Sequence, residues 1–378
     1  MIVTASMFNL IRSGILALLA FLLLACAGTE KPKPAELPPN AALIGVRLAW
    51  SARIGAVDFP LAVKVNGSRV SVASSDGAVM ALDAETGREL WRAQAGAALA
   101  AGVGSDGKMA AVVTRANMLV AFSEGRELWR QKISAQVFTA PLVAGERVFV
   151  LAADRSVSAY DGLTGRKLWT QQRPGESLVL RQAGVILAVG DTLVAGLSGR
   201  MVGLNPLSGS VRWEAPLATA RGTNDVERLV DLVGGVSREG NVVCARAFQF
   251  SVGCVDAERG ALIWSQPANG AVGVQGNGRS LFGVESDSKV LAWNRVSGER
   301  LWVSERLKYR GLTAPVVAGR SVVVGDNTGL LHLLSVEDGS PLNRLVTDGS
   351  AIAAAPVLSG DTLIAVTRNG GIFGFRPE

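Results

Sequence analysis

Side chains that commonly perform acid–base, metal or nucleophilic chemistry are few in this chain. The sequence contains one histidine, His332, which argues against a multi-histidine metal site and against a Ser-His-Asp triad. Two pairs of acidic residues could act as a general acid and base, namely Asp83 with Glu85 and Glu337 with Asp338. Both pairs lie in recurring turns, where a carboxylate accepts backbone hydrogen bonds. We therefore interpret His332 and these acids as structural and predict that the protein is not an enzyme.

Cysteine is the other reactive residue type, and it occurs three times, at Cys26, Cys244 and Cys254. Cys244 and Cys254 fall on consecutive strands of one predicted hairpin, at an even separation that could place both side chains on one face. A cross-strand disulfide in an oxidising compartment and two buried free thiols are both consistent with this spacing. No two cysteines are adjacent, and no C-x-x-C-H haem motif occurs.

The elements that position these residues come from a motif that ends in tryptophan and returns about every 40 residues. Clear copies span residues 81–91, 159–169, 203–213 and 292–302. Weaker copies end at Trp129 and Trp264, and a further copy has Asn343 where tryptophan belongs. Alternating apolar segments and turns fill each repeat, without a helical pattern. Four short strands in about 40 residues are typical of one β-propeller blade.

Glycine provides an independent count of the blades. In the motif turn, glycine adopts a left-handed backbone without steric cost, and the tryptophan that follows is expected to pack between neighbouring blades. A second glycine recurs in the turn that joins the first two strands of each repeat: Gly67, Gly107, Gly145, Gly190, Gly240, Gly278, Gly319 and Gly360. These eight turns predict an all-β fold over residues 43–378, an eight-bladed β-propeller of four-stranded blades.

Both ends of the repeat array are expected to meet in one blade. The chain stops at residues 373–378, after a third strand and without a terminal tryptophan motif. Trp50, before the first full repeat, belongs to the missing outer strand. We predict that the N-terminal strand around residues 48–50 pairs with the C-terminal strand near residues 372–375 and closes the ring. Closure removes two strand edges that could otherwise pair with other chains.

Residues 1–25 form a segment of a different kind. Arg12 precedes an apolar run of about 13 residues, shorter than the roughly 20 that span a bilayer and typical of a secretory signal peptide. The run ends in Leu23-Leu24-Ala25-Cys26, which resembles the lipobox of bacterial lipoproteins. This resemblance implies cleavage before Cys26 and lipid on its thiol. The alternatives are an uncleaved transmembrane anchor and a cysteine that stands there by chance.

Residues 26–42 are polar and rich in proline, which is typical of an extended tether. We expect this tether to hold the propeller away from a membrane surface. The lipoprotein resemblance also implies sorting to the outer membrane, because Ala27 rather than aspartate follows the cysteine.

Composition excludes one further class of function. The net charge of +6 and the pI near 9.5 are typical of nucleic-acid binders, but lysine and arginine form no cluster or aromatic-basic stripe. We therefore predict no nucleic-acid partner.

One interval breaks the repeat. Trp213 and Trp264 are 51 residues apart, and the surplus falls in residues 218–229, which carry both signs of charge. Because this insertion precedes the first strand of a blade, it must project from one rim. It is either a solvated loop or part of a binding surface.

The rim that bears the insertion also carries candidate partner-binding residues. Nine residues before each first-turn glycine we expect the innermost strand of the blade to begin. From Gly190 and Gly240 this gives Arg181 and Asp231, at equivalent positions of adjacent blades. Leu178 and Leu180 precede Arg181 as an apolar pair. An apolar pair beside an arginine, facing a loop of mixed charge, is typical of a protein-binding patch. Core packing is the alternative for each leucine individually.

An eight-bladed ring with a T-G-x-x-x-W motif resembles the quinoprotein dehydrogenases, which hold pyrroloquinoline quinone in the central channel. Those enzymes use a disulfide between adjacent cysteines, a calcium ion and a catalytic aspartate. This chain has no adjacent cysteines and is much shorter. We therefore expect no cofactor and no metal.

The sequence resembles a second family more specifically, that of the outer-membrane-protein assembly lipoprotein BamB. The likeness covers the lipobox and all eight blades, and it is most specific in residues 325–332, 336–339 and 177–181. It implies a scaffold that binds the periplasmic (POTRA) domains of the β-barrel insertase BamA, within the Bam complex, and aids barrel assembly. Its partner-contacting residues carry over to Leu178, Leu180, Arg181 and Asp231. A further acidic contact of the family would fall on Val233.

The leading hypothesis is thus a non-enzymatic lipoprotein of the outer membrane, on its periplasmic face, that binds BamA through this rim and is otherwise monomeric. A quinone-dependent dehydrogenase and a periplasmic ligand-sensing propeller are the alternatives.

Overall fold

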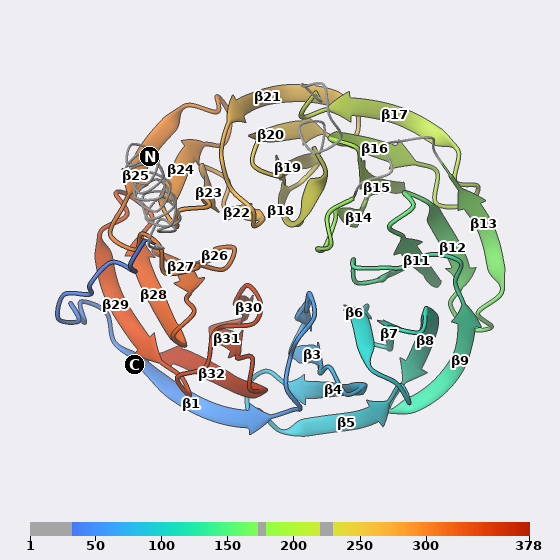
Figure 1. The fold of residues 1–378 in the computed structure, drawn as a ribbon, viewed down its shortest axis with the longest axis horizontal. Helices are drawn as coiled ribbons and strands as arrows, with labels where there is room; N and C mark the ends of the chain where they lie inside the picture. Colours follow the sequence, from blue (N-terminus) through green and yellow to red (C-terminus); the bar gives the residue numbers. More distant parts are fainter. Residues whose placement is uncertain (1–31, 173–178, 220–229) are drawn as a thin grey trace, which may run out of the picture. The chain divides into compact units, whose positions relative to one another are not determined.

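In the computed structural model, residues 32–172, 179–219 and 230–378 are described. They form strands and turns, and none of them belongs to a helix that could cross a bilayer. Residues 35–378 form one compact unit, distinct from residues 1–34. Within the larger unit, eight antiparallel four-stranded sheets form a ring (Figure 1). This confirms the predicted fold, an all-β, eight-bladed β-propeller.

Each blade runs from an inner strand to an outer strand in sequence order, except the last. Blades 1 to 4 contain β2 (Lys64–Asn66), β3 (Arg69–Ala73), β4 (Ala78–Asp83) and β5 (Glu89–Gln94); β6 (Leu99–Ser105), β7 (Met109–Thr114), β8 (Met118–Ser123) and β9 (Arg126–Lys132); β10 (Leu142–Ala144), β11 (Arg147–Leu151), β12 (Val157–Asp161) and β13 (Lys167–Gln171); β14 (Ile186–Val189), β15 (Thr192–Leu197), β16 (Arg200–Leu204) and β17 (Val211–Pro216). Blades 5 to 8 contain β18 (Leu232–Glu239), β19 (Val242–Ala247), β20 (Ser251–Asp256) and β21 (Ala261–Pro267); β22 (Val274–Gly276), β23 (Ser280–Val284), β24 (Val290–Asn294) and β25 (Arg300–Ser304); β26 (Val316–Ala318), β27 (Ser321–Gly325), β28 (Leu330–Ser335) and β29 (Pro341–Val346); β30 (Val357–Ser359), β31 (Thr362–Val366), β32 (Gly371–Pro377) and β1 (Val46–Arg53). Each of the eight predicted first-turn glycines lies between the first two strands of its blade.

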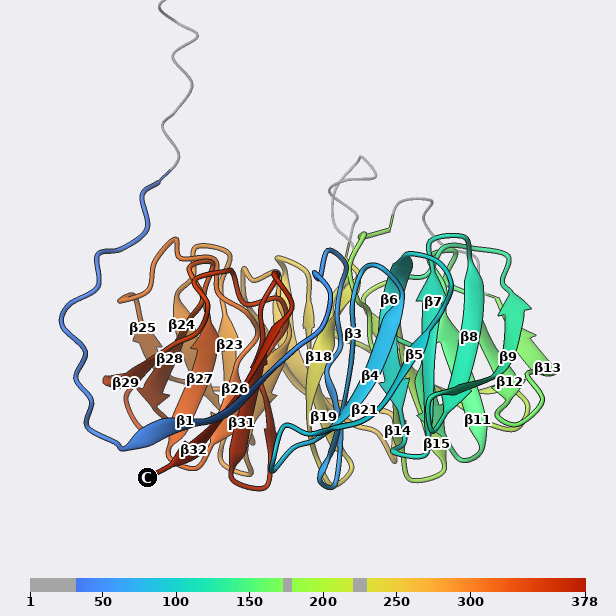
Figure 2. The same cartoon turned by 90° about the horizontal axis from the view of Figure 1, so that it is seen from below.

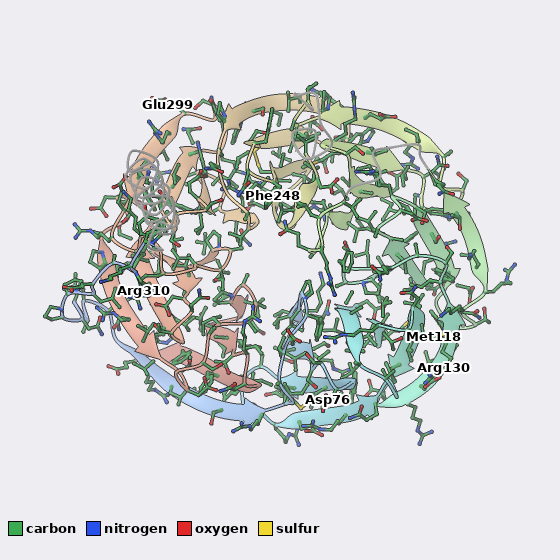
Figure 3. The ribbon with its side chains drawn as sticks, in the orientation of Figure 1. Asp76, Met118, Arg130, Phe248, Glu299 and Arg310 are labelled. Atoms are coloured by element: carbon green, nitrogen blue, oxygen red, sulfur yellow. A yellow bond between two sulfur atoms is a disulfide. The ribbon has the colours of Figure 1, made fainter. Side chains whose placement is uncertain are left out.

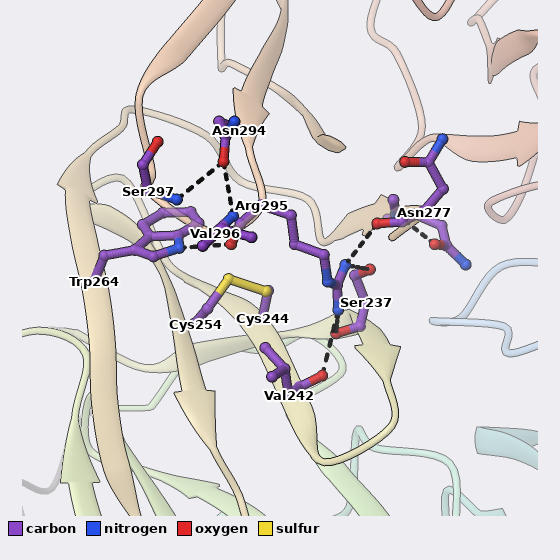
Figure 4. The surroundings of a disulfide bond; sticks show 12 residues. Ser237, Val242, Cys244, Cys254, Trp264, Asn277, Asn294, Arg295, Val296 and Ser297 are labelled. Atoms are coloured by element: carbon purple, nitrogen blue, oxygen red, sulfur yellow. Dashed lines mark hydrogen bonds between the residues drawn. A yellow bond between two sulfur atoms is a disulfide. The ribbon is translucent and has the colours of Figure 1, made fainter. Parts of the chain in front are cut away.

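Tryptophans of the repeat motif connect neighbouring blades, as predicted. The indole Nε1 of Trp264 on β21 donates a hydrogen bond of 2.8 Å to the carbonyl of Arg295, in the outer turn of the next blade (Figure 4). The ring also lies against Gly298, where an added Cβ would be 2.6 Å from a ring carbon. Four other tryptophans donate in the same way to the next blade: Trp50 to Ala84, Trp129 to Gly162, Trp169 to Pro206 and Trp302 to Val336. These five wedges thus combine apolar packing with a hydrogen bond, whereas the indole nitrogens of Trp91 and Trp213 have no hydrogen-bond partner among the described residues.

Asn343 on β29 replaces tryptophan for a reason that the topology makes clear. A tryptophan wedge needs the outer turn of the following blade, but blade 8 has no such turn, because its third strand ends the chain and its fourth strand begins the propeller. In its place, the Asn343 side-chain amide donates a hydrogen bond of 2.7 Å to the carbonyl of Ile44, just before β1. Asn343 therefore replaces the motif tryptophan in the blade that precedes blade 8, where β32 and β1 meet.

Blade 8 is assembled from both ends of the unit. Strand β1 pairs antiparallel with β32, from Val46 opposite Pro377 to Arg53 opposite Gly371, with one irregularity between Leu48 and Trp50 (Figures 1 and 2). Trp50 is 9% exposed and lies against Gly374 of β32 and against Gly87 of blade 1. Pairing with β1 leaves β32 without a free edge in the described part of the chain.

Residues 35–44, partly assigned by the sequence to the tether, contact the outer part of blade 7 in the structure. The Arg344 guanidinium donates to the carbonyl of Pro38 at 2.6 Å, and the Arg310 guanidinium to that of Ala35 at 3.1 Å. Leu43 adds a backbone hydrogen bond to Leu342. A proline-rich segment has few N–H donors for a strand ladder, so it binds through its carbonyls. The compact unit consequently begins at Ala35 rather than at residue 43.

Strands β19 and β20 place Cys244 directly opposite Cys254, and the two sulfur atoms form a disulfide (Figure 4). Both side chains are fully buried, among apolar residues that include Trp264. The strand register explains the pairing, since directly opposite residues project from the same face of a sheet.

We predict that this disulfide forms in the mature protein and stabilises it. The bond joins residues 10 apart in sequence, so chain-entropy arguments give roughly 2–3 kcal/mol. Urea unfolding with reductant should show a free energy of unfolding lower by about that amount than without it. Thiol labelling of both cysteines in the unfolded, unreduced protein would contradict the prediction.

Candidate functional site

Three consecutive blades contribute to the rim where the sequence placed its candidate binding residues. Because all blades repeat the same up-and-down order, the turns between second and third strands and the connections that enter each blade lie on one face of the ring. Arg155 lies in the β11–β12 turn of blade 3, Leu180 and Arg181 precede β14 of blade 4, and Asp231 immediately precedes β18 of blade 5. The structure therefore brings these residues together, as proposed for Leu180, Arg181 and Asp231.

Asp231 connects the three blades. One carboxylate oxygen accepts a hydrogen bond of 3.0 Å from the backbone N–H of Leu180, and the other lies 3.5 Å from the Arg155 guanidinium. The Asp231 carbonyl accepts from the N–H of Phe248 at 3.0 Å. The Asp231 side chain is 18% exposed, so it is largely engaged within the protein. Its carboxylate thus positions Leu180 on the rim, in addition to the contact role that the family resemblance implies.

Arg181 differs from Asp231 because it is exposed. Its guanidinium carbon lies 5.9 Å from the centre of the Phe138 ring, within the range of a cation–π interaction. Phe138 belongs to the connection that enters blade 3, and it is half-buried. The aromatic ring supports the arginine stem and leaves its donors available at the surface. An arginine held against an aromatic ring is a frequent anchor of protein interfaces.

A hollow of about 50 Å³ lies beside these residues and is lined by Phe138, Arg155, Leu180 and Asp231, among others. Small-molecule sites usually enclose 300–1,000 Å³. The hollow is therefore too small for a cofactor or a metabolite. Its size suits the tip of one side chain of a protein partner, which agrees with a protein-binding patch rather than a ligand site.

Some sequence expectations for this rim are corrected or lie outside the described residues. Arg181 does not begin an inner strand, because β14 starts at Ile186 and Arg181 lies in the preceding bend. Val233, where the family resemblance implies an acidic contact, is 5% exposed and pairs with Arg246 on β19. Its place in the sheet leaves it unable to reach a partner. Leu178 and the insertion at residues 220–229 lie outside the described residues.

Phe138 and Arg155 are the residues of this rim that sequence reasoning missed. Neither belongs to the repeat motif, and neither stands at a periodic position. For Phe138, the sequence signal was an aromatic residue shortly before the first strand of a blade. For Arg155 the sequence contained no comparable signal, because its contact with Asp231 spans two blades.

His332 is buried on β28, the third strand of blade 7. Its Nε2 lies 2.9 Å from an oxygen of Asp326. The same oxygen accepts a hydrogen bond of 2.8 Å from Arg310, which lies in the connection between β25 and β26 (Figure 3). Burial raises the pKa of Asp326, but hydrogen bonds from His332 and from the backbone of Leu330 and Thr328 outweigh burial and keep the pKa far below its usual value. Asp326 is therefore ionised, and it holds Arg310 in place to bind Ala35.

In the acidic turns, Asp83 and Asp338 accept the expected hydrogen bonds. Asp83 accepts hydrogen bonds from both the backbone N–H and the hydroxyl of Thr86, and these bonds lower its pKa. Asp338 accepts equivalent bonds from Ser340. Among the described residues, no three histidine, cysteine, aspartate or glutamate side chains are grouped as a metal site.

The fold defines a class: an eight-bladed β-propeller whose last blade combines strands from both ends of the compact unit. Comparison with known proteins specifies the family. A family model described as outer membrane protein assembly factor BamB matches residues 75–304. The BamB of Burkholderia pseudomallei is 37% identical over 94% of this chain and 94% of its own length. This chain therefore belongs to the BamB family of outer membrane protein assembly factors.

Solved structures share the fold. The crystal structure of BamB from Moraxella catarrhalis superimposes with a TM-score of 0.80 at 24% identity, covering 88% of this chain and 99% of that one. A europium-containing methanol dehydrogenase superimposes with a TM-score of 0.67 at 15% identity, covering 88% of this chain and 93% of that one. Likeness at such low identity demonstrates a common fold alone. This chain and the quinoprotein dehydrogenases therefore share the propeller architecture.

Proposed function

We propose that this protein is a non-enzymatic scaffold of the β-barrel assembly machinery. It binds the periplasmic domains of BamA through the rim formed by Leu178, Leu180, Arg181 and Asp231, and it aids insertion of β-barrel proteins into the outer membrane. Family membership supports the general role. The single observation that supports the site is the exposed Arg181 on Phe138, beside a hollow that suits one partner side chain.

The charges and contacts of the rim are consistent with protein recognition. Asp231 fixes the backbone at Leu180 through a hydrogen bond, so the apolar side chain is presented without a large entropic cost on binding. Arg181 adds a donor group with fixed direction. A central anchor surrounded by polar groups is the usual composition of a stable protein interface.

The location that we propose is the periplasmic face of the outer membrane, with a lipid on Cys26. Cys26 lies outside the described residues, so the lipobox sequence supports this part of the proposal.

Purification of the tagged full-length protein from detergent-solubilised membranes tests the function. We expect BamA and its associated subunits to co-elute, as identified by mass spectrometry. An eluate that contains the propeller and an unrelated partner, without BamA, would overturn the proposal. The same preparation, digested and analysed for a lipid-modified N-terminal peptide beginning at Cys26, tests the anchor separately.

A further inference from the structure

The central channel of the ring contains a cavity of about 630 Å³. Inner strands of seven blades and the segments before them line it, and only blade 2 makes no contribution. This volume lies within the usual range of small-molecule sites, whereas the hollow at the rim does not. The channel is therefore large enough for a ligand that the proposed scaffold function does not use.

Most of the side chains that line the channel are neutral and apolar. Valine, leucine, isoleucine, alanine, proline and glycine supply most of the wall. The two neutral polar side chains already have partners: Thr139 accepts a hydrogen bond of 2.8 Å from the N–H of Gly184, and Gln275 accepts one from the N–H of Gly276. Among the lining residues, Lys64 on β2 is the single ionisable side chain.

The Lys64 side chain has no hydrogen bond or ion pair with any residue in the described ranges. Burial lowers its pKa, and no neighbouring carboxylate offsets that effect. An ammonium group in apolar surroundings is costly unless an anion or a strong acceptor pairs with it. Lys64 is half-buried in the channel wall, and an anion that enters the channel can pair with its ammonium group.

The repeat shows that the fold does not require a charge at this position. Lys64 lies three residues before the first-turn glycine of blade 1. At the same position, the other blades have uncharged residues: Gly104, Leu142, Leu187, Ser237, Gln275, Val316 and Val357. Blade 1 alone has a charged residue at this position, and that residue, Lys64, lines the cavity.

We propose that the channel binds an anionic amphiphile, namely a carboxylate on an unbranched hydrocarbon chain. The Lys64 ammonium donates charge-assisted hydrogen bonds to the carboxylate, and the hydrocarbon lies along the apolar wall. A charged head group alone would lose the wall contacts, and an uncharged chain would leave Lys64 unpaired. Both parts of the ligand are therefore needed for binding.

Isothermal titration of the purified full-length protein tests the site, with decanoate, decanol and acetate as probes. Decanoate should bind saturably with one site, and decanol and acetate at least about tenfold more weakly. Lys64→Met retains the apolar stem and should weaken decanoate at least about tenfold, as expected for loss of a charged hydrogen bond. Lys108→Met, which removes an exposed charge in the β6–β7 turn, should leave binding unchanged.

Wild-type protein provides a second readout that does not depend on the folding of a variant. Reductive methylation followed by peptide mapping should show that decanoate protects Lys64 but not Lys108. Absence of saturable decanoate binding, equal binding of decanoate and decanol, or an unprotected Lys64 would each overturn the proposal. A failure here leaves the BamA proposal intact, because the rim residues differ from Lys64.

Discussion

Deletion of residues 43–52 should lower the free energy of unfolding by at least about 5 kcal/mol. Trp50 is 9% exposed, and loss of a buried tryptophan side chain alone usually costs about 3–5 kcal/mol. The deletion also removes the strand that pairs with β32 from Gly371 to Pro377. Chemical denaturation followed by tryptophan fluorescence measures the loss.

The deletion should also change the association state. Without β1, the β32 edge presents unpaired backbone groups that can pair with another molecule. We therefore expect concentration-dependent oligomers by size-exclusion chromatography with light scattering. Leu48→Thr is the matched control, since Leu48 lies on the same strand but is 49% exposed. A deletion variant that stays monomeric and unfolds like the wild type would show that β1 does not close the ring.

Replacement of Gly298 by alanine should cost about 3 kcal/mol. Its φ is +74°, a conformation that costs a residue with a Cβ roughly 1–2 kcal/mol. The new methyl carbon would also lie 2.6 Å from the Trp264 ring, and such overpacking typically adds 1–3 kcal/mol. Because the indole would have to move, its hydrogen bond to Arg295 should weaken too.

Gly278→Ala is the control for this substitution. Gly278 lies in a first-turn position where an added Cβ meets no atom within 4 Å, so we expect a change within about 0.5 kcal/mol. Thermal and urea unfolding of both variants compare the two turns of the repeat directly. Equal stabilities of the two variants would contradict the interpretation of tryptophan as an inter-blade wedge that requires glycine.

Much of the fold follows from periodic features of the sequence. The first-turn glycines correctly predict eight blades, and the tryptophan motif predicts the contacts between them, because each copy repeats the same local geometry. Asn343 is also understandable from the repeat, since the blade after it is the one without a covalent outer turn. Features that every blade shares can therefore be predicted from the repeat, because each blade packs against its neighbours in the same way.

Features that involve one blade only were harder to predict. Residues 35–44 resemble a linker in composition, and their docking depends on Arg310 and Arg344, far away in sequence. The internal role of Asp231 depends on Arg155 in another blade. At the rim, counting back from the first-turn glycines placed Arg181 and Asp231 near each other. The count could not reveal that the Asp231 side chain is mainly buried while Arg181 is exposed. Such differences arise from connections of unequal length, which have no period.

The central claim is that the protein binds BamA through the rim that bears Arg181. Binding of the purified BamA periplasmic domains to wild-type, Arg181→Glu and Arg368→Glu proteins measures this most directly. Arg368 is exposed on the same face in blade 8, so its reversal changes the net charge equally. We predict that Arg181→Glu weakens binding at least about 30-fold, the usual loss at an anchoring arginine, and that Arg368→Glu binds like the wild type. Equal affinity of wild-type and Arg181→Glu proteins would contradict the account.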